Sequence, residues 1–409
     1  MIKAIKHISI PRKIALLLLA ASVFCLPFWP FIVPRILTFY AVAAIVVLII
    51  EKAKFRFDYR FILLILFYLL HLLGLAWTEN MGAGTFDLEV KLSFFIFPLL
   101  CLFLQYSKQE FKAILWAFLA GLIFTFLFNF TKAGMLYQET GSFNSFFYNS
   151  LSEPLHPGYL SMYLNLGMII LLVSLFVQEK RMFKNTKMHY LLFALFFVFN
   201  LMVFSKNGVA VSVLLAILLF YHLLVVKKKV LLALSSVLLS GALMLLVYSQ
   251  SSFVRNNIEE MMSNLVYEEV DEHHKAQGSV SLRWVVWEAS IEVIKDQPWI
   301  GVGTGDAGTH LIEEYKKKNE VVALEKKLNS HNQFLQTFVV LGLLGFSVLV
   351  MIFGVGILRS IKEQNYLALG FLILVLINCL TESAFETQAG TVFFAIFYCL
   401  TLSLRTNEA

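Results

Sequence analysis

Long apolar stretches recur along almost the whole chain, and they restrict its fold more than any other feature. Twelve such runs occupy residues 14–29, 36–50, 61–77, 92–104, 113–130, 159–177, 190–204, 208–226, 230–248, 333–358, 366–380 and 391–404. A membrane-spanning helix needs about 20 apolar residues, and several of the runs are shorter. The runs mix Leu, Phe, Ile and Ala without alternation, which favours helices over the strands of a barrel. The sequence therefore predicts an all-α, polytopic membrane bundle of about twelve transmembrane helices.

Composition and charge agree with this prediction. Hydrophobic residues make up 59% of the chain and charged residues only 15%, which is unlike a soluble globular protein. If the basic N-terminal segment stays in the cytoplasm, alternate polar segments are rich in Lys and Arg, as the positive-inside rule requires. Both termini are then cytoplasmic. The net charge of +6 follows from this topology, and no nucleic-acid partner is expected because no basic run is interleaved with aromatic residues.

The polar segments suggest three regions. Residues 1–248 would hold about nine N-terminal transmembrane helices, residues 249–331 a large loop on the outer face, and residues 332–409 about three C-terminal transmembrane helices. Within the loop, apolar residues at 282, 285, 286, 289, 293 and 294 follow helical spacing, so an amphipathic helix is predicted that Pro298 ends. We expect the chemistry in this loop, because the membrane runs themselves are almost free of charge.

Three ionisable residues stand out. His331 lies where the polar loop meets an apolar run, and an imidazole, which titrates near neutral pH, suits a general base. A capping or interfacial histidine is an equal alternative. Arg283 lies on the amphipathic helix, where a solvated charge is the simpler interpretation. Lys206 lies in a very short polar turn, where it could equally be an ordinary interfacial lysine.

Further polar residues are candidates for substrate binding. Glu382 and Glu386 are spaced four apart, so they could hold a sugar or order Lys or His partners, although simple solvation explains them equally well. The segment around Tyr159 either lines a cavity for the lipid carrier or merely starts a helix at Pro157. The substrate-binding candidates in this group are Lys91, Tyr159, Asn332, Gln336 and Glu382.

No metal site and no cofactor are predicted. The first outward loop, WPFIVPR, contains no acidic residue. The sequence DEHH at 271–274 imitates a metal-binding cluster, but four adjacent side chains cannot all point at one ion. A solvated loop is therefore the favoured interpretation of residues 271–274.

Three motifs follow one another in a fixed order along the second half of the chain. They are Ser205 with Lys206 in a short turn, then Arg283, Trp287 and Ala289 followed by Pro298, Gly301 and Gly303, and finally His331, Asn332, Leu335, Gln336 and Gly342. Their order and spacing resemble the O-antigen ligase and polymerase superfamily, most specifically over residues 200–345. Many members carry Arg where this chain has Lys206, which keeps the charge but loses bidentate phosphate geometry.

The resemblance implies a membrane glycosyltransferase at the periplasmic face of the bacterial inner membrane. Such an enzyme transfers a glycan from a polyprenyl diphosphate carrier to an acceptor hydroxyl without a metal ion. His331 would act as the base, and Arg283 with Lys206 would clamp the diphosphate. We favour a ligase, whose acceptor is a lipid A core sugar; the alternatives are a polysaccharide polymerase and a protein O-oligosaccharyltransferase. Donor, acceptor and membrane lipid are the expected partners.

A lipid-linked glycan flippase or a secondary transporter is the competing class. Such proteins also have about twelve spans, but they carry ionisable or helix-breaking groups near mid-membrane. The apolar runs here contain no Asp, Glu, Lys or Arg near their centres, so an enzyme is preferred. Uptake of the donor driven by a proton or sodium gradient would reverse that preference.

Overall fold

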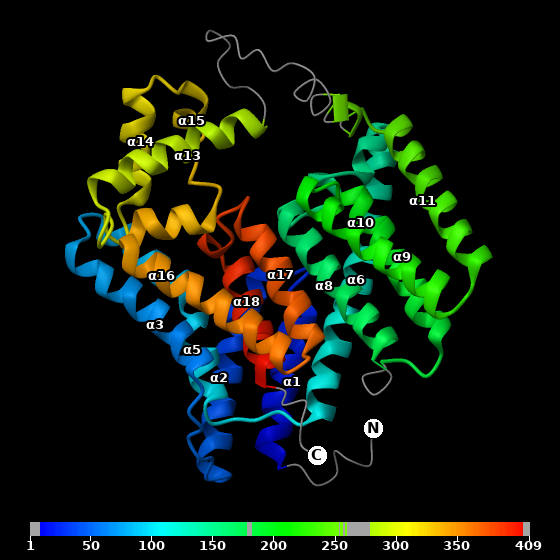
Figure 1. The fold of residues 1–409 in the computed structure, drawn as a ribbon, viewed down its shortest axis with the longest axis horizontal. Helices are drawn as coiled ribbons and strands as arrows, with labels where there is room; N and C mark the ends of the chain where they lie inside the picture. Colours follow the sequence, from blue (N-terminus) through cyan, green and yellow to red (C-terminus); the bar gives the residue numbers. More distant parts are fainter. Residues whose placement is uncertain (1–8, 178–181, 253, 257, 260–278, 404–409) are drawn as a thin grey trace. The chain divides into compact units, whose positions relative to one another are not determined.

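The computed structural model describes residues 9–177, 182–252, 254–256, 258–259 and 279–403. Throughout these ranges the chain forms helices joined by turns, with no strand (Figure 1). The predicted all-α class is confirmed.

Every predicted apolar run overlaps a helix. These helices are α1 (Ile10–Cys25), α2 (Val33–Ile50), α3 (Tyr59–Gly74), α5 (Ser93–Cys101), α6 (Lys108–Thr140), α8 (Pro157–Phe176), α9 (Thr186–Val203), α10 (Lys206–Tyr221), α11 (Val230–Gln250), α16 (Gln333–Lys362), α17 (Tyr366–Cys379) and α18 (Gln388–Ser403). Between them lie α4 (Met81–Lys91), α7 (Asn149–Ser152), α13 (Ser279–Asp296), α14 (Ala307–Lys317) and α15 (Val321–Glu325).

Seven helices of the described chain are long and apolar enough to cross a membrane. They are Pro30–Ile50, Tyr59–Trp77, Lys108–Thr140, Pro157–Phe176, Thr186–Val203, Lys206–Val226 and Gln333–Lys362. Helices α17 and α18 are apolar but shorter. The run at 92–104 yields only the nine-residue α5, which contains Pro98, a residue that cannot donate a helical hydrogen bond. The number of about twelve spans, the loop on the outer face and the cytoplasmic termini stay predictions.

The chain divides into two compact units. The first comprises Met1–Lys52 with Tyr106–Asn264, and the second comprises Ala53–Gln105 with Leu265–Ala409. The second unit therefore contains α3, α4, α5 and all the helices from α13 onward. The boundaries at residues 248 and 331, which concern position relative to the membrane, stay predictions.

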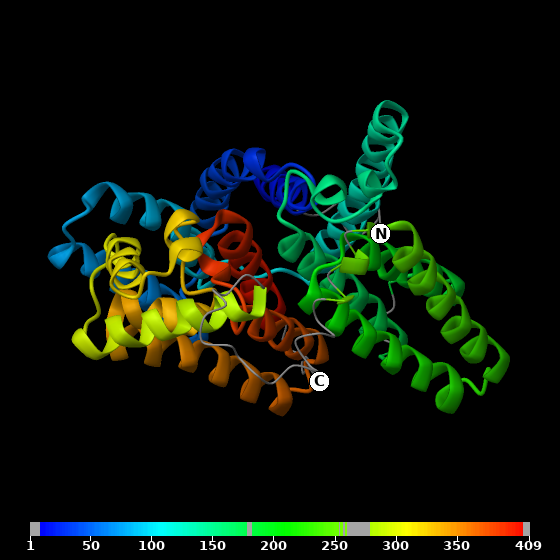
Figure 2. The same ribbon diagram turned by 90° about the horizontal axis from the view of Figure 1, so that it is seen from above.

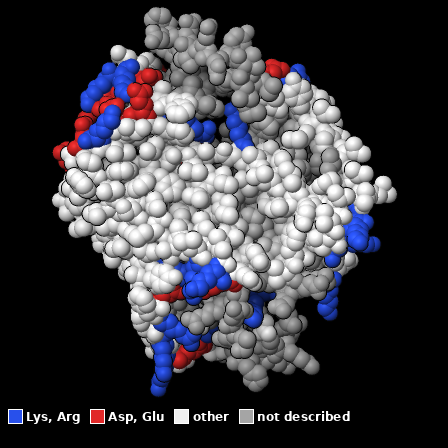
Figure 3. All heavy atoms as spheres, in the orientation of Figure 1, with Lys and Arg blue, Asp and Glu red and all other residues white. Residues whose placement is uncertain are grey.

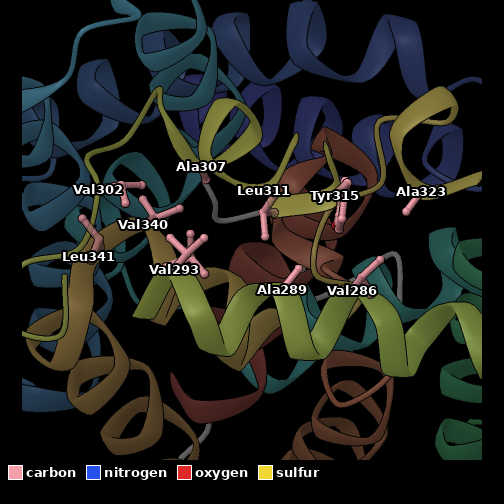
Figure 4. Packing of buried hydrophobic residues seen from close by; sticks show 11 residues of the cluster. Val286, Ala289, Val293, Val302, Ala307, Leu311, Tyr315, Ala323, Val340 and Leu341 are labelled. Atoms are coloured by element: carbon pink, nitrogen blue, oxygen red, sulfur yellow. The ribbon is translucent and has the colours of Figure 1, made fainter. Parts of the chain in front are cut away.

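Helix α13 in the second unit is amphipathic, as predicted. Its buried residues Val286, Ala289 and Val293 point toward Leu311 and Tyr315 of α14 (Figure 4). On its opposite face the side chain of Trp284 is 66% exposed. The helix ends two residues before Pro298, because proline cannot continue a helical hydrogen-bond ladder.

Helix α16 is broken at Gly342. The backbone of this residue has φ 61° and ψ −158°, a conformation that essentially only glycine adopts. A Cβ atom placed on Gly342 would clash with the carbonyl carbon of Trp299. The motif glycine predicted from the sequence is therefore required for both its conformation and its close backbone contact.

The turn at residues 298–303 fills this break. The N–H groups of Val302 and Gly303 donate to the carbonyls of Val339 and Val340 at 2.9 and 3.1 Å, and the N–H of Leu343 donates to the carbonyl of Pro298 at 2.9 Å. Backbone groups released by a break in a membrane helix need such partners from the protein itself. The turn after α13 and the membrane helix α16 therefore form one hydrogen-bonded structure.

Charge is unevenly distributed over the second unit. Helix α13 packs against the first part of α16, and α14 and α15 lie close to α13 (Figures 1 and 2). On the face shown in Figure 3, positive and negative side chains gather over α14 and α15, whereas the surface over α3 and α16 is uncharged for most of its length. An uncharged surface over α3 and α16 is what membrane-spanning helices require.

Candidate active site

The entrance of α16 fixes the position of His331. Asn332 is the N-cap of this helix, and its Oδ1 accepts from the N–H groups of Phe334 and Leu335 at 2.9 and 3.2 Å. Asparagine is among the preferred N-cap residues. Its Nδ2 donates to the carbonyl of Leu380 at 3.1 Å, which ties the helix start to the segment after α17. His331 immediately precedes this cap and has a left-handed backbone with φ 42°.

Glu382 joins His331 to Arg283. Its Oε2 lies 3.0 Å from Nδ1 of His331, and its Oε1 accepts from Nη2 of Arg283 at 3.1 Å. The three side chains come from α13, from the entrance of α16 and from the segment after α17. They are 25% (Arg283), 31% (His331) and 32% (Glu382) exposed. A base, a cation and a carboxylate thus form one cluster that is held by the protein and still reachable from solvent.

Two buried donors lie beside this cluster. Within the described part of the chain, Nε of Arg283 and Nε1 of Trp287 are buried and have no hydrogen-bond partner. A buried donor without a partner lowers the stability of the fold by about 1–3 kcal/mol, and nearly all buried donors in folded proteins have a partner. Because the two residues are four apart on α13, they lie on the same face of the helix. This face of α13 therefore carries two buried N–H groups without an acceptor among the described residues.

A second polar cluster follows directly from the first. Nε2 of Gln333 donates to Oε1 of Glu386 at 3.1 Å, and Oε1 of Gln333 accepts from the N–H of Phe385 at 2.6 Å. Nζ of Lys91 lies 3.2 Å from Oε2 of Glu386 and also donates to Asp87. The Lys91 side chain is only 1% exposed. Lys91, a substrate-binding candidate from the sequence, is thus enclosed by protein and paired with two carboxylates.

Burial and pairing change the charge states of this second cluster. Burial alone lowers the pKa of Lys91, but the attraction of Asp87 and Glu386 outweighs it, so that the pKa of the ammonium is raised. Burial raises the pKa of Glu386, and the opposing effect of Lys91 is too small to cancel it. Lys91 is therefore firmly charged, whereas Glu386 ionises less readily than an ordinary glutamate.

Gln336 connects α16 to the loop before it. Its Oε1 accepts from the N–H and the hydroxyl of Ser330 at 3.2 and 2.9 Å, and the hydroxyl of Ser290 on α13 donates to that of Ser330 at 2.9 Å. The Gln336 side chain is buried. These contacts position the residues around His331 from the side of α13.

Lys206 and Tyr159 belong to the other unit. Lys206 is the first residue of α10. The buried Asn165 and Asn200 donate to the carbonyl of Gly208 at 3.0 and 3.2 Å and so fix the start of this helix. Tyr159 lies in the first turn of α8, which begins at Pro157 as its sequence suggested.

No metal-binding group is evident where the structure can be described. Among those residues, no set of three or more His, Cys, Asp or Glu side chains is arranged to hold an ion. Residues 271–274 lie outside the described residues, so the interpretation of DEHH stays a prediction.

Comparison with known proteins connects these features to a family. Residues 190–350 match the family model described as O-antigen ligase, and the matched stretch contains Lys206, Arg283 and His331. Glu382 lies beyond the matched residues. No curated protein matches the chain at a significant level. This match over residues 190–350 supports the resemblance to the O-antigen ligase and polymerase superfamily.

Proposed function

We propose that this protein is an O-antigen ligase-like glycosyltransferase. It would transfer a glycan from a polyprenyl diphosphate carrier to a hydroxyl of a lipid A core sugar at the periplasmic face of the inner membrane. The family match indicates ligase or polymerase activity in general. The observation that supports the proposal best is the contact of Glu382 with both His331 and Arg283, which brings a base and a cation together.

His331 is the general base in this proposal. In this proposal Nδ1–H of His331 donates a hydrogen bond to Glu382, so Nε2 is left to take the proton of the acceptor hydroxyl. The hydroxyl oxygen forms a bond to the anomeric carbon as the bond from that carbon to the diphosphate oxygen breaks. The electron pair of the broken bond leaves with the polyprenyl diphosphate. Because this is a single displacement, the anomeric configuration is inverted.

Arg283 stabilises the charge that develops on the leaving diphosphate. Its guanidinium carries several N–H groups in one plane, a geometry that matches phosphate oxygens. Nη2 is held by Glu382, and the guanidinium, whose side chain is 25% exposed, is proposed to contact the donor. Lys206 is proposed as the second cation of the clamp. A clamp of two cations would make a metal ion unnecessary in the proposed reaction.

The other candidates take different parts in the proposal. Asn332 and Gln336 already use polar atoms within the protein, so they position the site. Tyr159 is proposed to line the path of the carrier lipid. Lys91 was a substrate-binding candidate in the sequence, but its contacts with Asp87 and Glu386 favour a supporting role.

A reconstituted transfer assay tests this function. Polyprenyl-diphosphate-linked glycan and lipid A core are supplied with a chelator, and wild type is compared with His331→Ala, Arg283→Ala and Lys206→Ala. Lys295→Ala, at an exposed ion pair on α13, serves as the control. Loss of the base should lower the rate by at least about 100-fold.

The products separate the alternatives. Longer carrier-linked glycans without a core product would identify a polymerase. Passage of the donor across the bilayer without any transfer would identify a flippase. A wild-type rate in His331→Ala, or retention of the anomeric configuration, would refute the proposed mechanism.

A further inference from the structure

Hydrogen bonds join the start of α16 to the segment after α17 on both sides of Glu382, the residue that contacts His331. On one side, Nδ2 of Asn332 donates to the carbonyl of Leu380 at 3.1 Å. On the other side, Gln333 donates to the carboxylate of Glu386 at 3.1 Å and accepts from the backbone of the same segment at 2.6 Å. Along the segment after α17, Glu382 thus lies between residues that are connected to the start of α16, and His331 directly precedes that start.

The second connection reaches a third element. Glu386 contacts Lys91 at the end of α4, and Lys91 in turn contacts Asp87 one turn earlier on the same helix. The side chains of Gln333 and Lys91 are 0% and 1% exposed. Buried and mutually paired groups of this kind hold their positions closely, because moving one leaves the others without partners.

We infer that Gln333 and Glu386, together with the buried Lys91, are positioning residues that hold His331 against Glu382. This inference rests on the proposed role of His331 as the base. The left-handed backbone of His331 is an uncommon conformation that the surrounding contacts must maintain. Asn332 and Gln333, the two residues that follow His331, supply some of these contacts.

Lys91 then has an electrostatic role within the protein. Glu386 and Asp87 are two carboxylates in one largely buried place, and without a cation their charges would repel each other. Lys91 would therefore be dispensable once both carboxylates are made neutral. A lysine that bound the diphosphate of the donor would remain essential in the same background.

The first test concerns Gln333. Gln333→Leu removes both of its side-chain connections to the segment after α17. We expect kcat to fall by about 100-fold, the loss caused by a catalytic group misplaced by about 1 Å. The KM for the polyprenyl-diphosphate-linked donor should stay within about twofold. In the His331→Ala background the same substitution should have no further effect, because the group that it positions is already missing.

The second test concerns Lys91. Lys91→Met should lose transfer activity, and the triple variant Lys91→Met, Asp87→Asn, Glu386→Gln should regain most of it, since the amide that replaces the carboxylate of Glu386 can still accept from Gln333. Arg60→Met is the matched control. Arg60 is also buried and paired with two carboxylates, but its partner Glu363 lies at the opposite end of α16. This control should lose thermal stability without a specific loss of kcat.

The outcomes separate this inference from the proposed function. A folded triple variant that stays inactive would overturn the inference, because Lys91 would then be needed for its own charge. Full activity of Gln333→Leu with an inactive His331→Ala would overturn the inference alone. Full activity of His331→Ala would overturn the proposed function itself.

Discussion

The contact between Glu382 and His331 gives a quantitative prediction for Glu382→Gln. The substitution keeps the size of the side chain but removes the negative charge 3.0 Å from Nδ1 of His331. A hydrogen bond to a charged group contributes about 1.5–3 kcal/mol. Both side chains are about one-third exposed, which weakens the interaction, so we take about 2 kcal/mol. This free energy corresponds to a fall in kcat of about 30-fold.

Donor binding should change little in the same variant. Arg283 loses its carboxylate partner but keeps its charge, so the KM for the donor should stay within about threefold. Initial rates with a labelled glycan donor at saturating acceptor measure both parameters. Glu288→Gln is the control, because Glu288 lies on α13 in an exposed ion pair with Lys318. A variant with normal kcat and a raised KM would refute the reasoning, since Glu382 would then bind substrate and would not orient the base.

Three further predictions concern the helix break, the buried carboxylate and the clamp. Gly342→Ala should lower the free energy of unfolding by at least about 1–2 kcal/mol, because alanine disfavours positive φ and its Cβ would meet the Trp299 backbone. Gly354→Ala in the same helix meets no atom within 4 Å and is the control, so equal unfolding midpoints would contradict this argument. Because the pKa of Glu386 is raised in the folded protein, its protonated form stabilises the fold. This stabilisation is complete below the ordinary pKa of glutamate and is lost as the pH rises through the pKa of Glu386 in the folded protein. Between about pH 5 and pH 8 the melting temperature of wild type should therefore fall more than that of Glu386→Gln. Parallel curves of melting temperature against pH would count against a raised pKa of Glu386. Arg283→Lys should raise the KM for the donor by about tenfold, the equivalent of one charged hydrogen bond, and an unchanged KM would exclude Arg283 from donor binding.

The helical class could be predicted from the sequence because a chain in lipid must satisfy its backbone hydrogen bonds internally. The same argument gives no reliable count of spans, since apolar length alone does not show where a helix stops. The run at 92–104 illustrates this limit, because Pro98 lies within it and the helix there has only nine residues.

The individual site residues were more predictable than their contacts. His331 and Arg283 could be selected from the residues that surround them in the sequence. Their connection through Glu382 could not, because Glu382 is 51 residues from one and 99 from the other. Helical periodicity relates residues only within a few turns.

The sequence indicated the cluster around Lys91 and Glu386 less clearly. Asp87 and Lys91 are four apart on one helix, which is the spacing of an ion pair. The burial of Lys91 could not be predicted, because it depends on the packing of α4 against the segment that carries Glu386. Gln333 was missed altogether, since a glutamine at a helix start has many ordinary explanations.

The break in α16 affects how the protein responds to its membrane. Residues 343–362 could form about 30 Å of helix, which is close to the thickness of the hydrocarbon core. A span of this kind adjusts to a thicker or thinner bilayer by tilting. The part of α16 before Gly342 is hydrogen-bonded to the turn at residues 298–303 and is separated from the span by a bend. The same turn also accepts the N–H of Leu343, the first residue of the span, so we expect a change in tilt to reach the turn and the start of α16 together.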